Sequence, residues 1–144
     1  MTLRTVIVNT NVVVAGLLTR EASPVARILD GMLAAAFPFV VSEALLAEYR
    51  TVLVRPSLRK QHGLTVVEVE TILTDLVQHA IVLAPVAAPR APDPGDQLLW
   101  ELLAARADLV LVTGDKELLE DAGMRGRVIS PRVFLSLPLP LRRG

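Results

Sequence analysis

The chain contains no cysteine, so disulfide bonds and thiolate metal sites are both excluded. Aromatic residues make up only 3% of the 144 residues, whereas hydrophobic residues make up 52%, so the core must consist mainly of Val, Leu, Ile and Ala. This composition is typical of parallel strands covered by helices rather than of an aromatic-rich sandwich. A chain of this length fits a single domain with a substantial core.

An excess of charge is also missing, because Lys plus Arg and Asp plus Glu both number 15. Any basic surface for nucleic acid must therefore be local. No apolar run reaches the ~18 residues that a spanning helix needs, and the N-terminus MTLRTVIVN lacks a signal-peptide pattern. We therefore expect a cytoplasmic protein without a membrane partner.

Short apolar runs alternate with helical patterns along the chain. Strands are expected at residues 3–8, 37–41, 81–83 and 109–112, with a weaker fifth at 128–129. Apolar spacing predicts helices after Ser23, after Ser42 as far as Leu53, after the capping box at Thr65, after Asp93, and from Lys116 to Ala122. Alternating strands and helices predict a three-layer α/β/α domain over residues 1–144, with a mostly parallel sheet of four to five strands. The tail from about residue 136, SLPLPLRRG, is expected to be loosely held.

Polar side chains interrupt the apolar stretch VIVNTNVVV and follow three other expected strands. In parallel sheets, ligands bind outside the carboxyl ends of the strands, so polar residues at these exits should meet at one edge. The residues concerned are Asn9, Thr10 and Asn11 after the first strand, Glu48 in the helix after the second, Asp93 and Asp96 after the third, and Thr113, Gly114 and Asp115 after the fourth.

Each acid has both a structural and a functional interpretation. Glu48 borders the apolar arc of its helix, whereas Glu43 points nearly the opposite way, so Glu48 needs a partner such as a metal cation or Arg55. Asp93 and Asp115 are placed to cap the helices that follow them, and Asp96 would fit a first helical turn.

Taken together, Glu48, Asp96 and Asp115 would repel one another at one edge unless a divalent cation lay between them. Carboxylate oxygens without His or Cys favour Mg²⁺ or Mn²⁺. Such ions bind substrate phosphates and support phosphodiester displacement, so the acids predict metal-assisted hydrolysis of a phosphoester.

The ordered set VIVNTNVVVAGLL, SEALLAEYRTVLVRP and DPGDQLLWELLAARADLVLVTGDKELL resembles the PIN-domain nucleases, particularly bacterial VapC-like toxin components. The resemblance implies a PIN-like α/β/α fold with an acidic pocket for Mg²⁺ or Mn²⁺ and cleavage of an RNA substrate. It also implies a cognate antitoxin that inserts into the active-site groove, and a homodimer.

The resemblance assigns family positions to residues of this chain. It implies that the second, third and fourth catalytic, metal-binding acids are Glu48, Asp96 and Asp115, with supporting roles for Asn11, Thr113 and Asp93. The first acid is replaced, because Asn9 stands where the family has Asp. An amide can coordinate a metal through its oxygen but lacks the negative charge, so metal affinity and activity should be weakened or abolished.

Two further questions stay open in the sequence. Arg55, Arg59 and Lys60 form a basic cluster that fits either RNA phosphates or a solvated face. The chain fits an active ribonuclease, or a catalytically inactive PIN-fold module that binds RNA or a protein. A phosphatase is disfavoured because the chain has neither a GxxxxGKS phosphate loop nor a DxD motif after the first strand.

Overall fold

A computed structural model describes residues 5–19, 22–124 and 126–137. Its centre is a five-stranded sheet in the order β3-β2-β1-β4-β5, and every strand pair is parallel. The strands are β1 (Val6–Val8), β2 (Phe39–Val41), β3 (Ile81–Val82), β4 (Val110–Val112) and β5 (Val128–Ile129). The expected α/β class is therefore confirmed, with five strands and a sheet that is wholly parallel.

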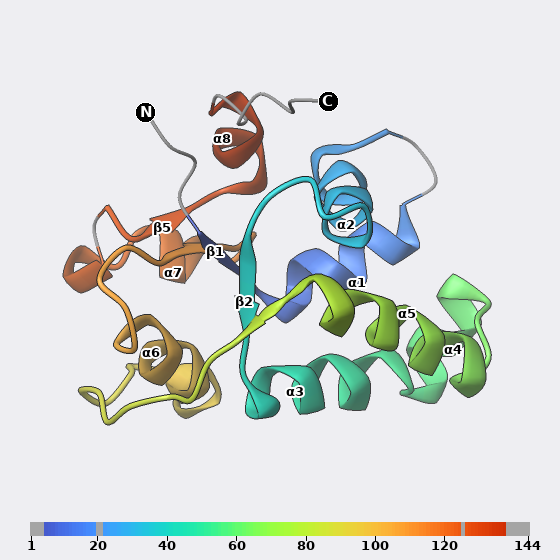
Figure 1. Cartoon of the computed structure of the whole chain (residues 1–144), viewed down its shortest axis with the longest axis horizontal. Coiled ribbons are helices and arrows are strands. Elements are labelled where there is room, and N and C mark those ends of the chain that lie inside the picture. The colour runs from blue at the N-terminus through green and yellow to red at the C-terminus, as the bar shows by residue number, and fades with distance from the viewer. Residues whose placement is uncertain (1–4, 20–21, 125, 138–144) are drawn as a thin grey trace.

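Helices cover the sheet on two sides. Figure 1 shows α1, α2 and α5 on one side and α6 and α7 on the other. The helices are α1 (Thr10–Leu18), α2 (Pro24–Leu33), α3 (Glu43–Leu53), α4 (Pro56–His62), α5 (Val66–His79), α6 (Gln97–Leu103), α7 (Lys116–Leu119) and α8 (Pro131–Ser136), with 3₁₀ turns η1 (Pro94–Asp96) and η2 (Ala122–Met124).

The strand order places a switch point between β1 and β4. The chain adds β2 and β3 on one side of β1, and then crosses to add β4 and β5 on the other side. Right-handed crossovers in the two directions put their helices on opposite faces of the sheet, and in folds of this kind ligands bind at the carboxyl ends of the two strands at the switch point. Asn9 and Thr113 directly follow these two strands.

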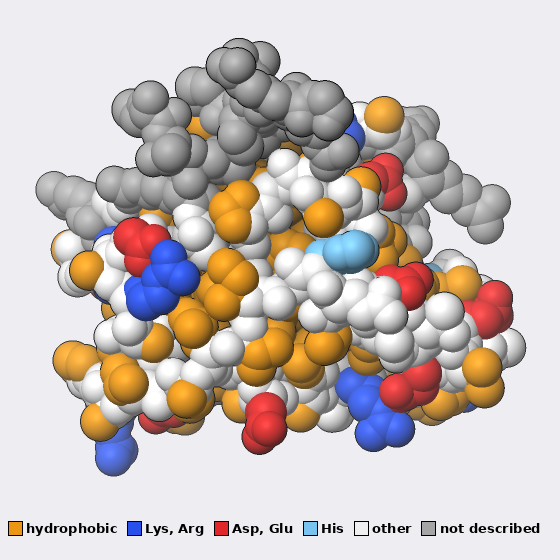
Figure 2. Space-filling model, viewed as in Figure 1, with side chains coloured by type: hydrophobic (Ala, Val, Ile, Leu, Met, Phe, Trp, Pro, Cys, Tyr) orange, Lys and Arg blue, Asp and Glu red, His pale blue; other side chains and the backbone are white. Residues whose placement is uncertain are grey.

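The core lies around the three central strands. All residues of β1, β2 and β4 are buried, as expected for parallel strands covered on both faces, whereas β3 and β5 form the more exposed edges. Phe37 packs edge-to-face on Phe134, with ring centroids 4.9 Å apart, and so attaches α8 to the body of the protein. Figure 2 shows charged side chains of both signs scattered over one face, in line with the zero net charge.

The first long helix departs from the sequence prediction. The first strand ends at Val8 as predicted, but the sequence predicts no helix before Ser23, whereas in the structure α1 begins at Thr10. The β-branched run from Val12 to Val14 favours a strand locally. Packing of α1 against α2 overrides this preference, because a Cβ on Gly16 would lie only 2.9 Å from the carbonyl oxygen of Val25. The two helices therefore approach each other closely.

Several other features of the helices differ from the predictions. Pro56 does not only end the helix before it but begins α4, because proline is tolerated at the first helical position. The helix expected at 116–122 ends at Leu119, and α8 was not predicted. The tail was expected to be loose from about residue 136, and residues 138–144 lie outside the described residues. Within the described residues, no helix is both long and apolar enough to cross a membrane.

Candidate functional site

Asn9 connects the ends of the two central strands at the switch point. Its backbone N–H donates to the carbonyl of Val112 at 2.9 Å, which continues the β1–β4 ladder by one step. Its side-chain Oδ1 accepts from the N–H of Thr10 at 2.8 Å and so caps α1. Its Nδ2 donates to Oγ1 of Thr113 at 2.9 Å. The side chain is 7% exposed, so its orientation is determined by these protein contacts.

The hydroxyl of Thr113 is the common acceptor at this edge. Besides Asn9, it accepts from Nδ2 of Asn11 at 3.3 Å and from the backbone N–H of Asp115 at 3.0 Å. Thr113 is fully buried. The two polar segments that follow β1 and β4 are therefore brought together, as the sequence predicted for this edge of the sheet.

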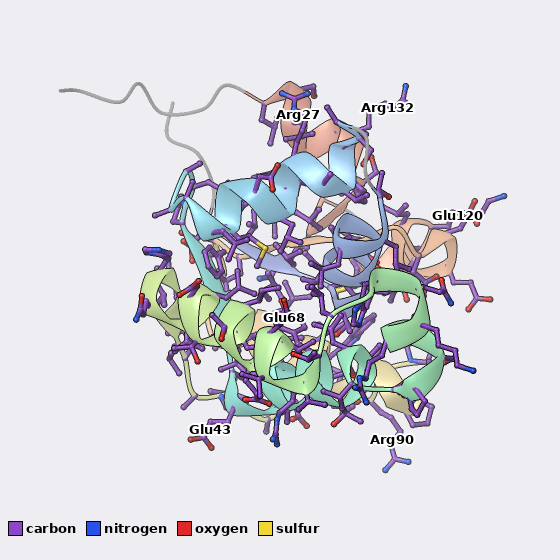
Figure 3. All side chains as sticks on the ribbon, turned by 90° about the vertical axis from the view of Figure 1, so that its right-hand side faces the viewer. Arg27, Glu43, Glu68, Arg90, Glu120 and Arg132 are labelled. Atoms are coloured by element: carbon purple, nitrogen blue, oxygen red, sulfur yellow. The ribbon has the colours of Figure 1, made fainter. Side chains whose placement is uncertain are left out.

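Glu48 lies half-buried in α3 and accepts a hydrogen bond from the hydroxyl of Thr10. Within the described residues it forms no salt bridge, so the alternative in which Arg55 pairs with Glu48 is wrong. Tyr49 points its hydroxyl inward and donates to the carbonyl of Val8 at the end of β1. Glu43 projects outward from the same helix, as expected from the helical spacing (Figure 3).

The aspartates at the helix starts divide into two kinds. Asp93 accepts from the N–H of Gly95, and Asp115 accepts from the N–H of Glu117, each at 2.9 Å. Their interpretation as caps is therefore confirmed, and each of these bonds engages only one carboxylate oxygen. Asp96 occupies the N-cap position of α6 but forms no side-chain cap hydrogen bond. Helix capping therefore does not account for the presence of a carboxylate at position 96.

Electrostatics show that the acids from different elements share one environment. The pKa of Asp96 is raised by burial first, and then by the negative charges of Asp93, Asp115, Glu48 and Glu117. Glu48 and Asp115 come from α3 and from the end of β4, so tertiary folding brings their charges near Asp96. A cation placed among these groups would relieve the repulsion.

The acids are near one another but do not form a closed ligand cage. In the part of the chain that the structure describes, no three Asp, Glu, His or Cys side chains are arranged so that together they could hold a metal ion. Mg²⁺ often uses only one or two carboxylates and keeps several waters. The oxygen-only donor set therefore fits a hard, hydrated divalent cation better than an ion that needs an enclosed site.

The basic cluster lies on α4 and at its N-cap. Arg55, Arg59 and Lys60 are exposed, and none of them forms a salt bridge with the described residues. The helix α4 packs against α1 and α3, which contribute Thr10 and Glu48 to the site. The basic cluster therefore lies on a helix that packs against the two helices that contribute Thr10 and Glu48.

The sequence places Thr10 at this edge with Asn9 and Asn11 but indicates no separate role for it, and it does not indicate Tyr49 or Glu117 as site residues. The inward contact of Tyr49 and the proximity of Glu117 to Asp96 depend on tertiary packing. No local pattern indicates either of them.

A family model described as the PIN domain matches residues 5–117, which is well over half of the chain. The chain belongs to the PIN-domain family. Residues from β1 to the start of α7 lie in the matched range, including every acid at this edge of the sheet, whereas β5 and α8 lie beyond it. PIN domains are typically nucleases, so the family assignment is that of a nuclease in general terms. A search of curated proteins found no match.

Proposed function

We propose that this PIN domain is a Mg²⁺- or Mn²⁺-dependent endoribonuclease whose activity is weakened or abolished by Asn9. The observation that supports this proposal best is the like-charge environment of Asp96 at the sheet switch point. Repulsion among Glu48, Asp96 and Asp115 does not stabilise the fold. A divalent cation bound between these carboxylates would be attracted by all three and would remove their repulsion.

The proposed division of roles follows from the hydrogen bonds. Glu48, Asp96 and Asp115 would hold the ion, because each has at least one carboxylate oxygen that accepts no hydrogen bond from the described residues. Asn9 would offer only its amide oxygen, which already accepts from Thr10. A bound ion of this type would activate water and stabilise charge on a phosphodiester. Asn11, Thr113 and Asp93 would keep the surrounding loops in place.

The basic cluster of Arg55, Arg59 and Lys60 would bind the phosphate backbone of RNA. Its charges are exposed and are not neutralised by salt bridges with the described residues. Contacts of this kind provide affinity without sequence readout. The resemblance to VapC-like toxins further supports a toxin role in the cytoplasm, a cognate antitoxin that covers the acidic edge, and a homodimer.

A second function is a PIN module that binds RNA or a protein without catalysis. Two observations favour it: an amide occupies position 9, and the described residues contain no closed three-ligand metal site. This module would bind RNA equally well with or without divalent cations, and Glu48→Ala would not change its binding.

Parallel titrations of this chain and its Asn9→Asp variant test the proposal. Binding of Mn²⁺ is measured by calorimetry, and cleavage is measured on a structured RNA. We expect cleavage to rise at least about tenfold in Asn9→Asp, since even residues around a metal site commonly change activity by that factor. An Asn9→Asp, Glu48→Gln variant controls for a contaminating nuclease. A folded Asn9→Asp variant that neither binds Mn²⁺ nor cleaves RNA would contradict the proposal and favour the binding module.

A further inference from the structure

Two neighbouring residues of α3 bind the chain on either side of Asn9. The hydroxyl of Tyr49 donates to the carbonyl of Val8, the last residue of β1, and Glu48 accepts from the hydroxyl of Thr10, the first residue of α1. Tyr49 is fully buried, and Thr10 is 6% exposed. The register of α3 relative to the end of β1 is therefore set by contacts at two adjacent positions.

Thr10 itself contacts two candidate metal ligands. Its backbone N–H donates to Oδ1 of Asn9 at 2.8 Å, and its hydroxyl donates to Oε1 of Glu48. The buried Thr10 therefore links Oδ1 of Asn9 to Oε1 of Glu48, through its backbone N–H and its hydroxyl. These two side chains come from different elements, and no direct hydrogen bond joins them among the described residues.

The bond from Thr10 is the only hydrogen bond of the Glu48 carboxylate in the part of the chain that the structure describes. A half-buried carboxylate usually needs compensation by several donors or by a cation. Here Oε1 accepts from a single neutral donor, while Oε2 accepts no hydrogen bond from the described residues. An oxygen kept free beside a restrained one is the arrangement expected for binding a cation through one carboxylate oxygen.

We propose that Thr10 is a positioning residue that orients the Glu48 carboxylate toward a divalent cation and sets its spacing from position 9. This inference rests on the proposed function. Thr10 is neither one of the acids nor one of the residues to which the PIN-domain resemblance assigns a role. Groups that hydrogen-bond to metal ligands commonly change metal affinity or activity by about 10–100-fold when they are removed.

Tyr49 supports the same arrangement at the level of the helix. Burial raises the pKa of its phenol, and the negative charge of Glu48 raises it further. The phenol therefore stays protonated at neutral pH and continues to donate to Val8. Tyr49 keeps α3 in register, whereas Thr10 acts on the carboxylate itself.

The test compares Thr10 variants in the Asn9→Asp protein, with that protein as the parent. Thr10→Val removes the hydroxyl at nearly constant shape, and Thr10→Ser retains it. Thr74→Val is the matched control, because the hydroxyl of Thr74 donates to a backbone carbonyl within α5, that of Glu70. Calorimetry measures Mn²⁺ affinity, and thermal unfolding without metal measures stability. Thr10→Ala replaces the Val variant if the latter does not fold.

We expect Thr10→Val to weaken Mn²⁺ binding by about tenfold or more, while Thr10→Ser and Thr74→Val stay close to the parent. In a Glu48→Gln background, Thr10→Val should weaken Mn²⁺ binding little further, because the two residues act through one contact. A purely structural role would lower the unfolding temperature of Thr10→Val without changing its Mn²⁺ affinity.

Two results would overturn the inference, and they can be told apart. If Thr10→Val binds Mn²⁺ as tightly as the parent while Glu48→Gln does not, Thr10 does not position the ligand, and the nuclease proposal stands. If the folded parent neither binds Mn²⁺ nor cleaves RNA, the proposed function fails and the inference fails with it.

Discussion

The side-chain amide of Asn9 donates to the hydroxyl oxygen of Thr113 at 2.9 Å, across 104 positions of the sequence. Asn11 and the backbone of Asp115 donate to the same oxygen, so three donors meet an atom that has two lone pairs. Within the described residues, the hydroxyl proton of Thr113 has no acceptor. An aspartate at position 9 could accept this proton with one oxygen and the Thr10 N–H with the other. The surroundings of position 9 therefore suit a carboxylate better than an amide.

Removing the hydroxyl of Thr113 should destabilise the protein. In Thr113→Val, the donors of Asn9, Asn11 and Asp115 lose a buried acceptor, and we expect unfolding to become easier by about 1–3 kcal/mol. Urea unfolding followed by circular dichroism measures the change. Thr5→Val is the control, because Thr5 is also buried but its side chain forms no hydrogen bond with the described residues. Equal stabilities of the two variants would contradict this prediction.

The raised pKa of Asp96 predicts a pH-dependent effect of Asp96→Asn. Since burial and neighbouring acids disfavour the charged form in the folded state, ionisation of Asp96 lowers stability as pH rises above its unfolded pKa. Asp96→Asn should therefore be more stable than the unmodified chain at neutral pH, by a few tenths to about 1 kcal/mol for this partly screened group.

The advantage of Asp96→Asn should shrink as the pH falls toward about 4, where Asp96 is protonated in the folded protein and increasingly in the unfolded chain. Urea unfolding of both proteins across this pH range, without divalent metal, gives the difference directly, and other titrating groups largely cancel. A stability difference that does not change with pH, or a less stable variant at neutral pH, would show that Asp96 is not under this repulsion.

Neutralising the basic cluster on α4 should weaken RNA binding and its dependence on salt. Replacing Arg55, Arg59 and Lys60 with Ser should lower the slope of log affinity against log salt by up to about 2, since each phosphate contact on a single strand contributes ~0.7. Fluorescence anisotropy with labelled RNA measures this slope. The charge-matched control replaces three exposed arginines from other parts of the surface (Figure 3), Arg27, Arg90 and Arg132. Equal slopes for both triple variants would exclude a specific role for α4.

Close packing of α1 on α2 makes Gly16 sensitive to substitution. A Cβ at this position would lie 2.9 Å from the carbonyl oxygen of Val25 and 3.0 Å from Cβ of Leu29, so α2 would have to move. We expect Gly16→Ala to destabilise the fold by about 1–3 kcal/mol, despite the higher helix propensity of alanine. Thermal unfolding measures the effect. Gly114→Ala should be nearly neutral for stability, because nothing lies within 4 Å of its added Cβ.

Much of the architecture was predictable because its signals are local. Ser23, Ser42 and Thr65 each cap a helix where the sequence placed one, and the capping box at Thr65 has both of its hydrogen bonds. Asp93 and Asp115 cap helical turns as their positions allowed. The alternation of strands and helices implied a parallel sheet, and this placed the residues that follow the strands at one edge.

The rest depended on contacts between distant segments. The run from Val12 to Val14 resembles a strand, and only packing of α1 against its neighbours makes it helical. Arg55 follows Glu48 closely enough in sequence to pair with it, yet the carboxylate binds Thr10, which precedes it by 38 positions. The acids were identifiable one by one, but their mutual repulsion arises from folding.

The sequence by itself determined the fold class, the helix caps and the edge of the sheet at which polar residues meet, because periodicity and capping depend on near neighbours. Only the tertiary structure decided which side chains bind one another there. Hydrogen-bond partners such as Asn9 and Thr113 require a fixed register between strands more than one hundred residues apart. That register is set by burial of the whole core, and no short stretch of sequence encodes it.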